Sequence, residues 1–143
     1  MKGSKVTGLF DSVRFRGVEL RNRIGISPMC QYSAEDGFTS RWHPIHLGSR
    51  AVGGAGMVMV EASAIVPEGR ISPQDLGIWK DEHIDGLREL ADVIRANGSV
   101  PAIQIAHAGR KASTHRRWEG GKPMKADEDG FWPVVGPSPV AFS

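Results

Sequence analysis

The chain of 143 residues has a single cysteine, little net charge and no long apolar run. With Cys30 alone, no disulfide can form within the chain, and nothing in the sequence indicates an oxidising compartment. The formal net charge of +2 gives no general attraction to nucleic acid or to an anionic membrane. The residues from Met1 to Leu9 lack the apolar core of a secretory signal, and no apolar run approaches the ~20 residues that span a bilayer. We therefore expect a cytoplasmic protein with neither nucleic-acid nor membrane partners.

Motifs for phosphate, metal or nucleophilic chemistry are also scarce. The glycine-rich residues 53–56 precede a predicted strand, whereas a phosphate-binding loop follows a strand and opens a helix, so they are better read as a helix stop. His43 and His46 can share a helix face, but with Cys30 they supply too few ligands for zinc, which favours packing or hydrogen-bonding histidines and no metal. The basic residues 110–118 could touch nucleic acid, but near-neutrality of the whole chain favours a solvated loop. Neither a serine-hydrolase elbow nor a P-loop is found.

What the sequence does contain is the alternation of strands and helices typical of an α/β domain, with 40% hydrophobic and 24% charged residues. The pattern predicts a hairpin over residues 13–20, strands at 24–26, 57–60 and 100–105, and helices at 42–52 and 83–96. A polar loop with an Asp36-Gly37 turn is expected over 31–41, and a long loop over 63–82. Strands and helices in this order predict a parallel sheet with its helices as crossovers.

Each predicted helix has an apolar face, and the chain becomes irregular after the last predicted strand. The expected packing residues are Trp42, Ile45, Leu47 and Val52 in the first helix, and Ile84, Leu87, Leu90, Ala91 and Ile94 in the second. From His107 onward, Gly, Pro, Lys and Arg are frequent, and only residues 131–135 have the character of a further strand. A long irregular segment of this kind is usually functional or part of a cap.

Polar side chains follow the predicted strands, at residues 27–32, 61–64 and 104–111. Ligands of parallel α/β folds lie beyond the carboxyl ends of the strands, so we expect a thiol, a phenol, an amide, a carboxylate and two cations to converge on one rim. Cys30 is as consistent with a functional thiol as with a small buried apolar residue. Gln104, expected at the end of a buried strand, must find hydrogen bonds, which a ligand with donors and acceptors on one edge would supply. For a buried Glu61, pairing with Arg50 or Arg110 is the favoured expectation.

The rim residues also resemble those of a known family. Residues 27–32, Ser-Pro-Met-Cys-Gln-Tyr, resemble the first-strand motif of the thermophilic-like class of Old Yellow Enzymes, which includes the xenobiotic reductases. Residues 42–56, 60–71 and 104–112 resemble later segments of that class in the same order. The resemblance implies a (β/α)8 TIM barrel, an α/β fold, of which this chain covers about the first three βα strands. The implied divisions are an N-terminal segment and hairpin at 1–23, the first βα units at 24–110, and a capping excursion at 111–143.

The resemblance implies that FMN binds at the carboxyl ends of the strands. The residues that it implies for cofactor binding are Ser27, Pro28, Met29, Cys30, Ala62 and Gln104. Cys30 would lie near the N5/O4 edge of the flavin and tune its redox potential, and Gln104 would pair with the pyrimidine edge. Tyr32 would reach the substrate over the flavin face, although taken alone it could be a surface aromatic. Cys30 and Tyr32 are therefore the candidate catalytic residues.

The implied activity is that of an ene-reductase: NADPH or NADH reduces FMN, and flavin N5 passes hydride to the β-carbon of an α,β-unsaturated substrate such as an enone. An eight-stranded barrel takes about 250 residues, so the expected partner is a remaining barrel segment or a second chain. Family members commonly form homo-oligomers. The alternatives are an inactive fragment that only associates or binds flavin weakly and, third, a zinc or nucleic-acid module.

Overall fold

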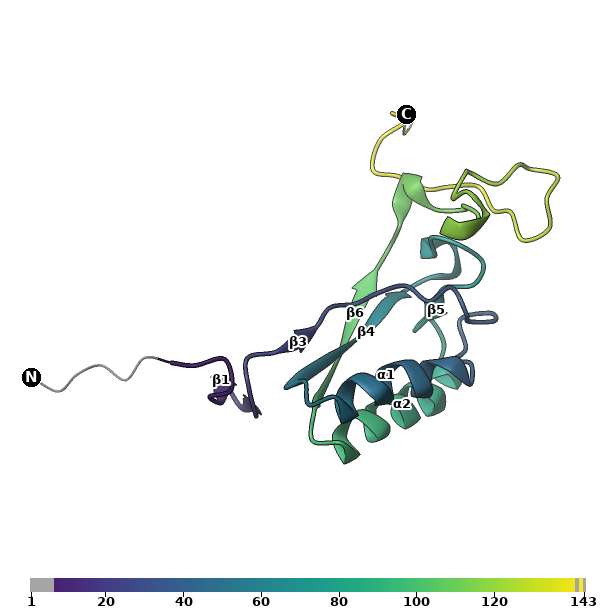
Figure 1. Cartoon of the computed structure of the whole chain (residues 1–143). Helices are drawn as coiled ribbons and strands as arrows, with labels where there is room; N and C mark the ends of the chain where they lie inside the picture. Colours follow the sequence, from purple (N-terminus) through teal and green to yellow (C-terminus); the bar gives the residue numbers. More distant parts are fainter. Residues whose placement is uncertain (1–6, 141, 143) are drawn as a thin grey trace, which may run out of the picture.

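The structure, a computed structural model, describes residues 7–140 and residue 142. The first six residues of the predicted N-terminal segment, and residues 141 and 143 of the predicted capping excursion, lie outside the described residues. In chain order the elements are β1 (Val13–Phe15), β2 (Val18–Leu20), β3 (Gly25–Ile26), α1 (Trp42–Val52), β4 (Met57–Ala64), β5 (Leu76–Gly77), α2 (Ile84–Ala96) and β6 (Val100–Ala106) (Figure 1). Single 3-10 turns lie at Pro67–Gly69, Asp81–His83, Gly109–Lys111 and Arg117–Glu119.

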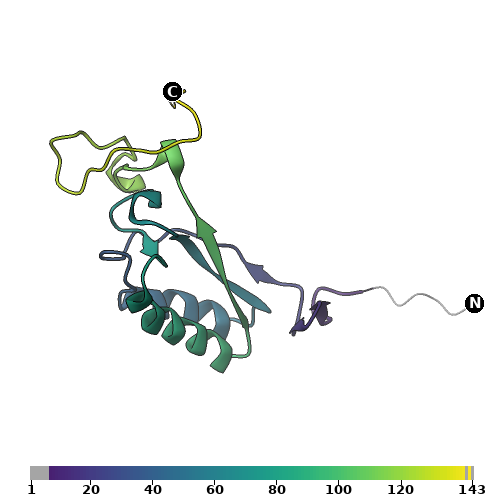
Figure 2. The same ribbon diagram turned by 180° about the vertical axis from the view of Figure 1, so that it is seen from behind.

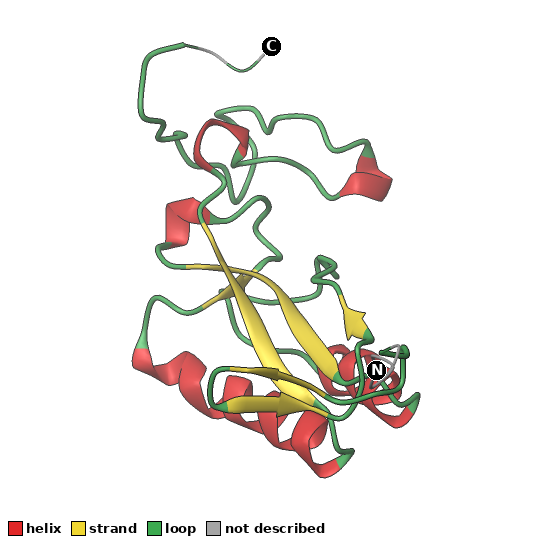
Figure 3. Ribbon diagram, turned by 90° about the vertical axis from the view of Figure 1, so that its left-hand side faces the viewer, coloured by secondary structure: helices red, strands yellow, loops and turns green. Residues whose placement is uncertain are grey.

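The predicted parallel sheet is confirmed, with β4 as its central strand (Figure 3). β6 pairs with β4 from its first residue to its last, in parallel. β3 pairs with the start of β4 and β5 with its end, also in parallel, so these two short strands share the other edge of β4. β1 and β2 form a separate antiparallel hairpin, as predicted.

Both helices cover the same face of the sheet (Figures 1 and 2). The buried core between them and the sheet consists of Ala34, Leu47, Ala51, Ala55, Val58, Val60, Leu76, Leu90 and Ile94. Val58 and Val60 point from β4 into this core, while Met57 and Met59, alternating with them along the strand, are only half-buried. The opposite face of the sheet has no helix over it among the described residues.

The packed face of α1 differs from the one predicted. Trp42, Ile45 and Val52 are exposed, and the buried residues of α1 are His43, His46, Leu47, Gly48 and Ala51. The reason is the close approach of α2: a Cβ added at Gly48 would lie 3.0 Å from the Val93 side chain. Small residues and two histidines therefore join Leu47, which is buried as predicted, on the packed side of α1. A pattern that counts only large apolar residues instead selects three residues that are exposed. In α2, Leu90 and Ile94 are buried as predicted, but Ile84 is exposed.

Several boundaries also differ. β4 continues to Ala64 instead of ending at Val60, and the predicted loop at 63–82 contains β5. α2 begins at Ile84, one residue late, after a 3-10 turn. The strand predicted at 131–135 is absent from the described chain; Trp132 there donates from Nε1 to the Glu68 carbonyl at 2.9 Å.

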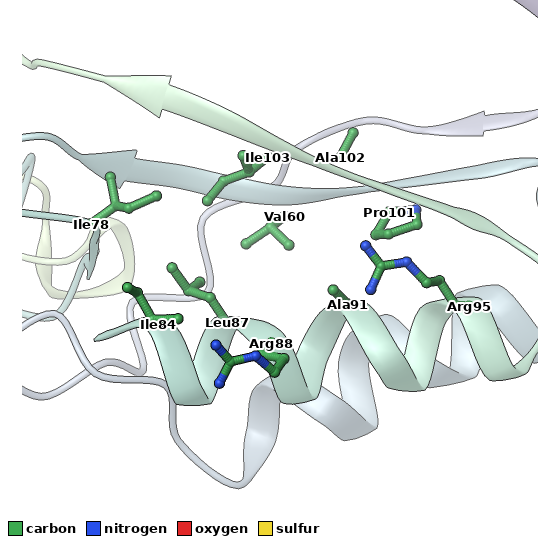
Figure 4. Close-up of a pocket in the computed structure, with 10 residues that line it drawn as sticks. All are labelled: Val60, Ile78, Ile84, Leu87, Arg88, Ala91, Arg95, Pro101, Ala102 and Ile103. Carbon is green, nitrogen blue, oxygen red and sulfur yellow. The ribbon is translucent and has the colours of Figure 1, made fainter. Parts of the chain in front are cut away.

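An apolar groove of about 350 Å³ lies between α2 and β6 (Figure 4). Its lining residues are Val60, Ile78, Ile84, Leu87, Arg88, Ala91, Arg95, Pro101, Ala102 and Ile103. β6 pairs with no strand other than β4 among the described residues, and Ile105 on it is 67% exposed. The sheet thus has an open edge beside an uncovered apolar surface. Within the described part of the chain, no helix has the length and apolar character that crossing a membrane requires.

Candidate functional site

The carboxyl ends of β3, β4 and β6 meet at one rim. Ala62 in β4 lies directly opposite Gln104 in the register of β6. The segment after β3 crosses to β4, where the Gln31 amide donates to Glu61 Oε1 at 3.0 Å and the Cys30 thiol lies beside the Ala62 main-chain amide. The structure therefore brings together Cys30, Ala62 and Gln104, which are separated in sequence.

Residues 27–30 run along this rim in an extended path. Ser27 and Met29 are exposed, whereas Pro28 and Cys30 are half-buried. Gln104 is exposed as well, so the expectation of a buried glutamine is wrong. Its side chain is exposed because, among the described residues, β6 has no strand on its second edge and the face of the sheet opposite α1 and α2 has no helix over it. The hydrogen bonds among the described residues include none to its carboxamide.

Glu61 is a buried carboxylate at the rim, with 3% of its surface exposed. It occupies a β-bulge: Val60 pairs with Ile103 and Ala62 with the next residue of β6, so Glu61 is the extra residue of β4. A bulge interrupts side-chain alternation and can re-aim a side chain. The bulge buries Glu61 together with both of its neighbours.

The expected partners of Glu61 are wrong. Arg50 donates to the His46 carbonyl and Ser49 hydroxyl, and Arg110 donates to residues near the end of the chain. Glu61 instead accepts the Gln31 amide, and its Oε2 lies 3.8 Å from His43 Nε2. Glu61 therefore binds a main-chain amide of the turn that follows β3, where the sequence had predicted the guanidinium of Arg50 or Arg110.

The surroundings of Glu61 favour its protonated form. Burial, with a smaller contribution from nearby Asp75, raises its pKa to about 7, against the lowering effect of the Gln31 and Tyr32 amides. His43 offers no compensating charge, since burial lowers its pKa. Its Nδ1 accepts the Ser40 amide at 2.9 Å, which leaves the ring proton on Nε2, facing Glu61.

Cys30 is held as a neutral thiol. Burial, followed by the charges of Asp75 and Glu61, raises its pKa to about 11, and the Ala62 amide offsets this only in part. A thiolate is the nucleophilic form of cysteine, so this site does not favour covalent chemistry at neutral pH.

Tyr32 is buried rather than a surface aromatic, with 8% of its surface exposed. Its backbone has φ +49°, a left-handed conformation that is uncommon for a residue with a side chain. Its ring meets Trp118 edge-on with centroids 5.5 Å apart. Burial and Cys30 raise the pKa of its phenol, and Arg117 beside it lowers that pKa. Arg117 and Trp118 therefore lie over Tyr32 at the end of the rim.

Residues 8–140 match the NADH:flavin oxidoreductase / NADH oxidase family. The chain belongs to this family. It is 55% identical over 108 residues to an NADPH dehydrogenase of Geobacillus sp. (strain WCH70), covering 74% of this chain and 32% of the relative. It is 51% identical over 128 residues to an NADPH dehydrogenase of Bacillus licheniformis, covering 88% and 38%. The chain thus spans about a third of the length of these curated relatives.

Solved structures agree with the family assignment. Morphinone reductase, solved with tetrahydroNAD, superposes with a TM-score of 0.71 at 27% identity over 96% of this chain and 41% of that protein. The Old Yellow Enzyme homologue from Zymomonas mobilis has a TM-score of 0.72 at 23% identity over 96% and 40%, a likeness of fold. The predicted Old Yellow Enzyme family and partial (β/α)8 barrel are confirmed. This is a family of enzymes, and FMN with NAD(P)H are its cofactor and reductant, as predicted.

In this flavin oxidoreductase fold, three residues near the rim were not predicted as site residues. Asp75 is 2% exposed, accepts the Ile71 amide at 2.7 Å and the Ser72 hydroxyl at 3.0 Å, and has a pKa raised chiefly by burial. The serine three residues before it was the available signal, because that spacing is typical of a capped turn. Arg117 and Trp118, the residues beside Tyr32, belong to the basic segment that was expected to be a solvated loop, and its lack of periodicity gave no sign that it packs against the rim.

A second cavity, of about 550 Å³, lies between Ile71 and the irregular segment that follows β6. Arg110, Lys111 and Arg117 are among its lining residues, whereas Cys30 and Ala62 are not, so the two cations predicted at 110–111 line this second cavity. No group of three or more potential metal-ligating His, Cys, Asp or Glu side chains occurs in the described residues. His43 and His46 are buried in α1, as packing or hydrogen-bonding histidines would be.

Proposed function

We propose that this chain forms the pyrimidine and N5-edge part of the FMN site in an ene-reductase that uses NADPH or NADH to reduce activated C=C bonds such as those of enones. The observation that carries the proposal is the rim at which Cys30 lies against the Ala62 main chain and Ala62 pairs with Gln104. Family membership and the NADPH dehydrogenase relatives support the choice of cofactor and reductant. When bound, reduced FMN supplies the hydride; the residues of this chain bind and orient it.

The chemistry of the rim fits FMN. The exposed carboxamide of Gln104 offers an acceptor oxygen and donor protons, which suits a pyrimidine edge that carries both kinds of group. Ser27 and Met29 are exposed on the adjoining segment, where a hydroxyl and an apolar side chain, with Pro28, can contact a flat ring system. Ala62 has a small side chain, so a ring can approach its backbone.

Cys30 and Tyr32 are proposed to act at the reacting edge of the site without covalent chemistry. The Cys30 thiol, kept protonated by its raised pKa, is proposed to tune the flavin potential through a weak hydrogen bond. The Tyr32 phenol, also protonated, is proposed to meet the substrate together with Trp118, which covers its ring.

The open edge of β6 and the groove beside α2 support the further proposal that activity requires the remaining barrel strands. A homo-oligomeric assembly is proposed from the family resemblance alone. We expect this chain alone to bind FMN poorly and to reduce no cyclohexenone. Mixing it with the C-terminal part of the Geobacillus relative, from the end of the matched region onward, is expected to restore NADPH oxidation with cyclohexenone. Steady-state turnover and the mass of the complex are the measurements. A monomeric, cooperatively folded, yellow preparation of this chain alone would contradict the requirement for further strands.

A matched pair of α2 variants makes this test specific to the groove. Leu87→Asp places a charge in the apolar lining and is expected to lower reconstituted turnover at least about tenfold, because burying an unpaired carboxylate costs more than 1.4 kcal/mol. Glu89→Gln changes an exposed residue of α2 outside the lining and should leave turnover unchanged. If the wild-type fragments associate without turnover, the alternative of an inactive fragment that merely associates or binds flavin weakly gains support instead.

The role of Cys30 is tested in the reconstituted enzyme. Cys30→Ala is expected to shift the flavin midpoint potential by about 30 mV, a tenfold change in equilibrium constant for a two-electron couple, while FMN stays bound. The physical reason is the loss of a polarizable thiol at the N5 edge without loss of the contacts from Gln104. Spectroelectrochemical titration gives the potential, and flavin absorbance after gel filtration gives the occupancy. Complete loss of FMN from this variant would instead assign Cys30 a structural role.

A further inference from the structure

Glu61 is a buried ionisable residue that has no role in the flavin site proposed above. Its side chain is 4% exposed, and among the described ranges 7–140 and 142 no lysine or arginine lies within 4.0 Å of its carboxylate oxygens. A buried carboxylate without a cation is costly, and an apolar side chain at a bulge would avoid that cost. Its hydrogen bonds show what the carboxylate does instead.

Other restraints on the turn at residues 30–32 act on the Gln31 carbonyl, which accepts the Ser33 hydroxyl at 2.9 Å, and on the Tyr32 ring, which packs against Trp118. The Gln31 amide donates to Glu61 Oε1 at 3.0 Å, and the Tyr32 amide also interacts with this carboxylate. Tyr32 has a left-handed backbone, which costs energy for a residue with a Cβ and persists only when its surroundings hold it. The Gln31 side chain, which donates to the Met29 carbonyl and accepts from Trp42, is part of the exposed surface of the turn. The inward-facing amides therefore depend on Glu61.

We propose that Glu61 is a positioning residue, whose carboxylate at the β4 bulge holds the 30–32 turn by its main-chain amides and thereby fixes where the Cys30 sulfur and the Tyr32 ring lie on the rim. The importance of that position rests on the proposed flavin site, but the contact itself does not. The bulge is the structural means, since it turns the residue before Ala62 toward the turn while Ala62 stays paired with β6.

The groups that face Glu61 come from each element packed around it. His43 approaches from α1, Asp75 from the loop before β5, and Cys30 from the turn itself. Asp75 and Glu61 both raise the pKa of the Cys30 thiol, but only Glu61 accepts hydrogen bonds from the turn amides. Asp75 bonds instead to Ile71 and Ser72. Asp75→Asn is therefore the matched control, because it removes a neighbouring charge and leaves the turn's acceptor in place.

The test follows amide hydrogen exchange of residues 30–32 in the full chain, without flavin, for wild type, Glu61→Gln, Glu61→Leu and Asp75→Asn. Glu61→Leu is expected to raise exchange of the Gln31 and Tyr32 amides at least about tenfold, since each loses a hydrogen bond to a charged group. Glu61→Gln keeps an acceptor oxygen and should stay within about threefold of wild type, as should Asp75→Asn. Exchange in α2 reports global unfolding and is measured in the same samples.

The single cysteine supplies a second readout. Alkylation of Cys30 by iodoacetamide at pH 8 should accelerate in both charge-removing variants, Glu61→Gln and Asp75→Asn, because the thiol pKa falls toward its ordinary value. In Glu61→Leu it should accelerate further, because the released turn also exposes the sulfur.

Equal amide exchange at residues 30–32 in Glu61→Leu and Asp75→Asn overturns the proposal. If Glu61→Leu also loses protection in α2, the result from Glu61→Gln decides. Protection of the Gln31 and Tyr32 amides that is retained in Glu61→Gln supports the positioning role of Glu61, and protection that is lost in this variant overturns it. Neither readout uses flavin or turnover, so failure here is distinct from failure to reconstitute the enzyme.

Discussion

Gly77→Ala is expected to destabilise the fold by about 3 kcal/mol, the upper part of the range for overpacking a tight site. An added Cβ would lie 2.1 Å from the Trp79 ring, a separation that no side-chain contact tolerates. The ring has little freedom to retreat, because His83 meets it edge-on at 4.6 Å and the Arg70 guanidinium lies 5.3 Å from its centroid. The backbone of Gly77 is fixed too, since it pairs with Ala64 at the end of β4.

Urea unfolding followed by far-UV circular dichroism measures this loss. Gly17→Ala is the control, because an added Cβ there meets nothing within 4 Å, and its effect should stay within about 0.5 kcal/mol. The consequence extends to the rim, since β5 is the strand beside the last residues of β4. Equal midpoints for the two alanine variants would mean that Trp79 moves aside at little cost and that β5 does not constrain the rim.

Local sequence patterns were sufficient for most of the framework. α1 has the bounds that its spacing predicted, because Gly53 and Gly54 end an apolar-periodic run, and the hairpin at 13–20 follows from strand residues on either side of a glycine. The convergence of Cys30, Ala62 and Gln104 followed from the strand ends and the parallel order alone, since parallel strands bring their carboxyl ends together. Which cofactor binds at such a rim came from the family resemblance, not from periodicity.

Contacts between distant segments defeated the same reasoning. β5 has two residues and exists because Leu76 and Gly77 pair with the end of β4, a pairing that no local pattern records. No local sequence pattern predicts the β4 bulge at Glu61 either. For the same reason, the sequence does not predict that Glu61 binds amides of the turn instead of an arginine. Tertiary packing sets where an extra residue is inserted in a strand. The sequence therefore predicts that Glu61 is buried, but not that its carboxylate accepts hydrogen bonds from the turn. Trp118 covers Tyr32 from a segment without periodicity, for which the same limit holds.

Glu61→Gln is expected to stabilise the protein by about 3 kcal/mol at pH 8 and by little at pH 4.5. The carboxyl pKa is raised from 4.5 in the unfolded chain to about 7 in the fold, and each unit corresponds to about 1.4 kcal/mol. Between these values the folded state binds more protons than the unfolded state, so the contribution of Glu61 to stability falls as the pH rises and is fully lost above pH 7. Glutamine cannot ionise, and the variant escapes this loss.

The measurement is the difference in unfolding free energy between variant and wild type at several pH values, because the wild-type curve alone mixes opposing groups. His43 and His46 have lowered pKa values, so their contribution rises with pH up to about 6.5, against the trend from Glu61. Asp75 also has a raised pKa, so its contribution to stability falls as the pH rises, like that of Glu61. Asp75 is unchanged in the variant, so its contribution cancels in the difference. A difference that does not change between pH 4.5 and pH 8 would mean that Glu61 is not desolvated in the fold. The expected rise instead means that the chain keeps a carboxylate that weakens it at neutral pH, a cost consistent with a residue retained to hold the turn beside the flavin.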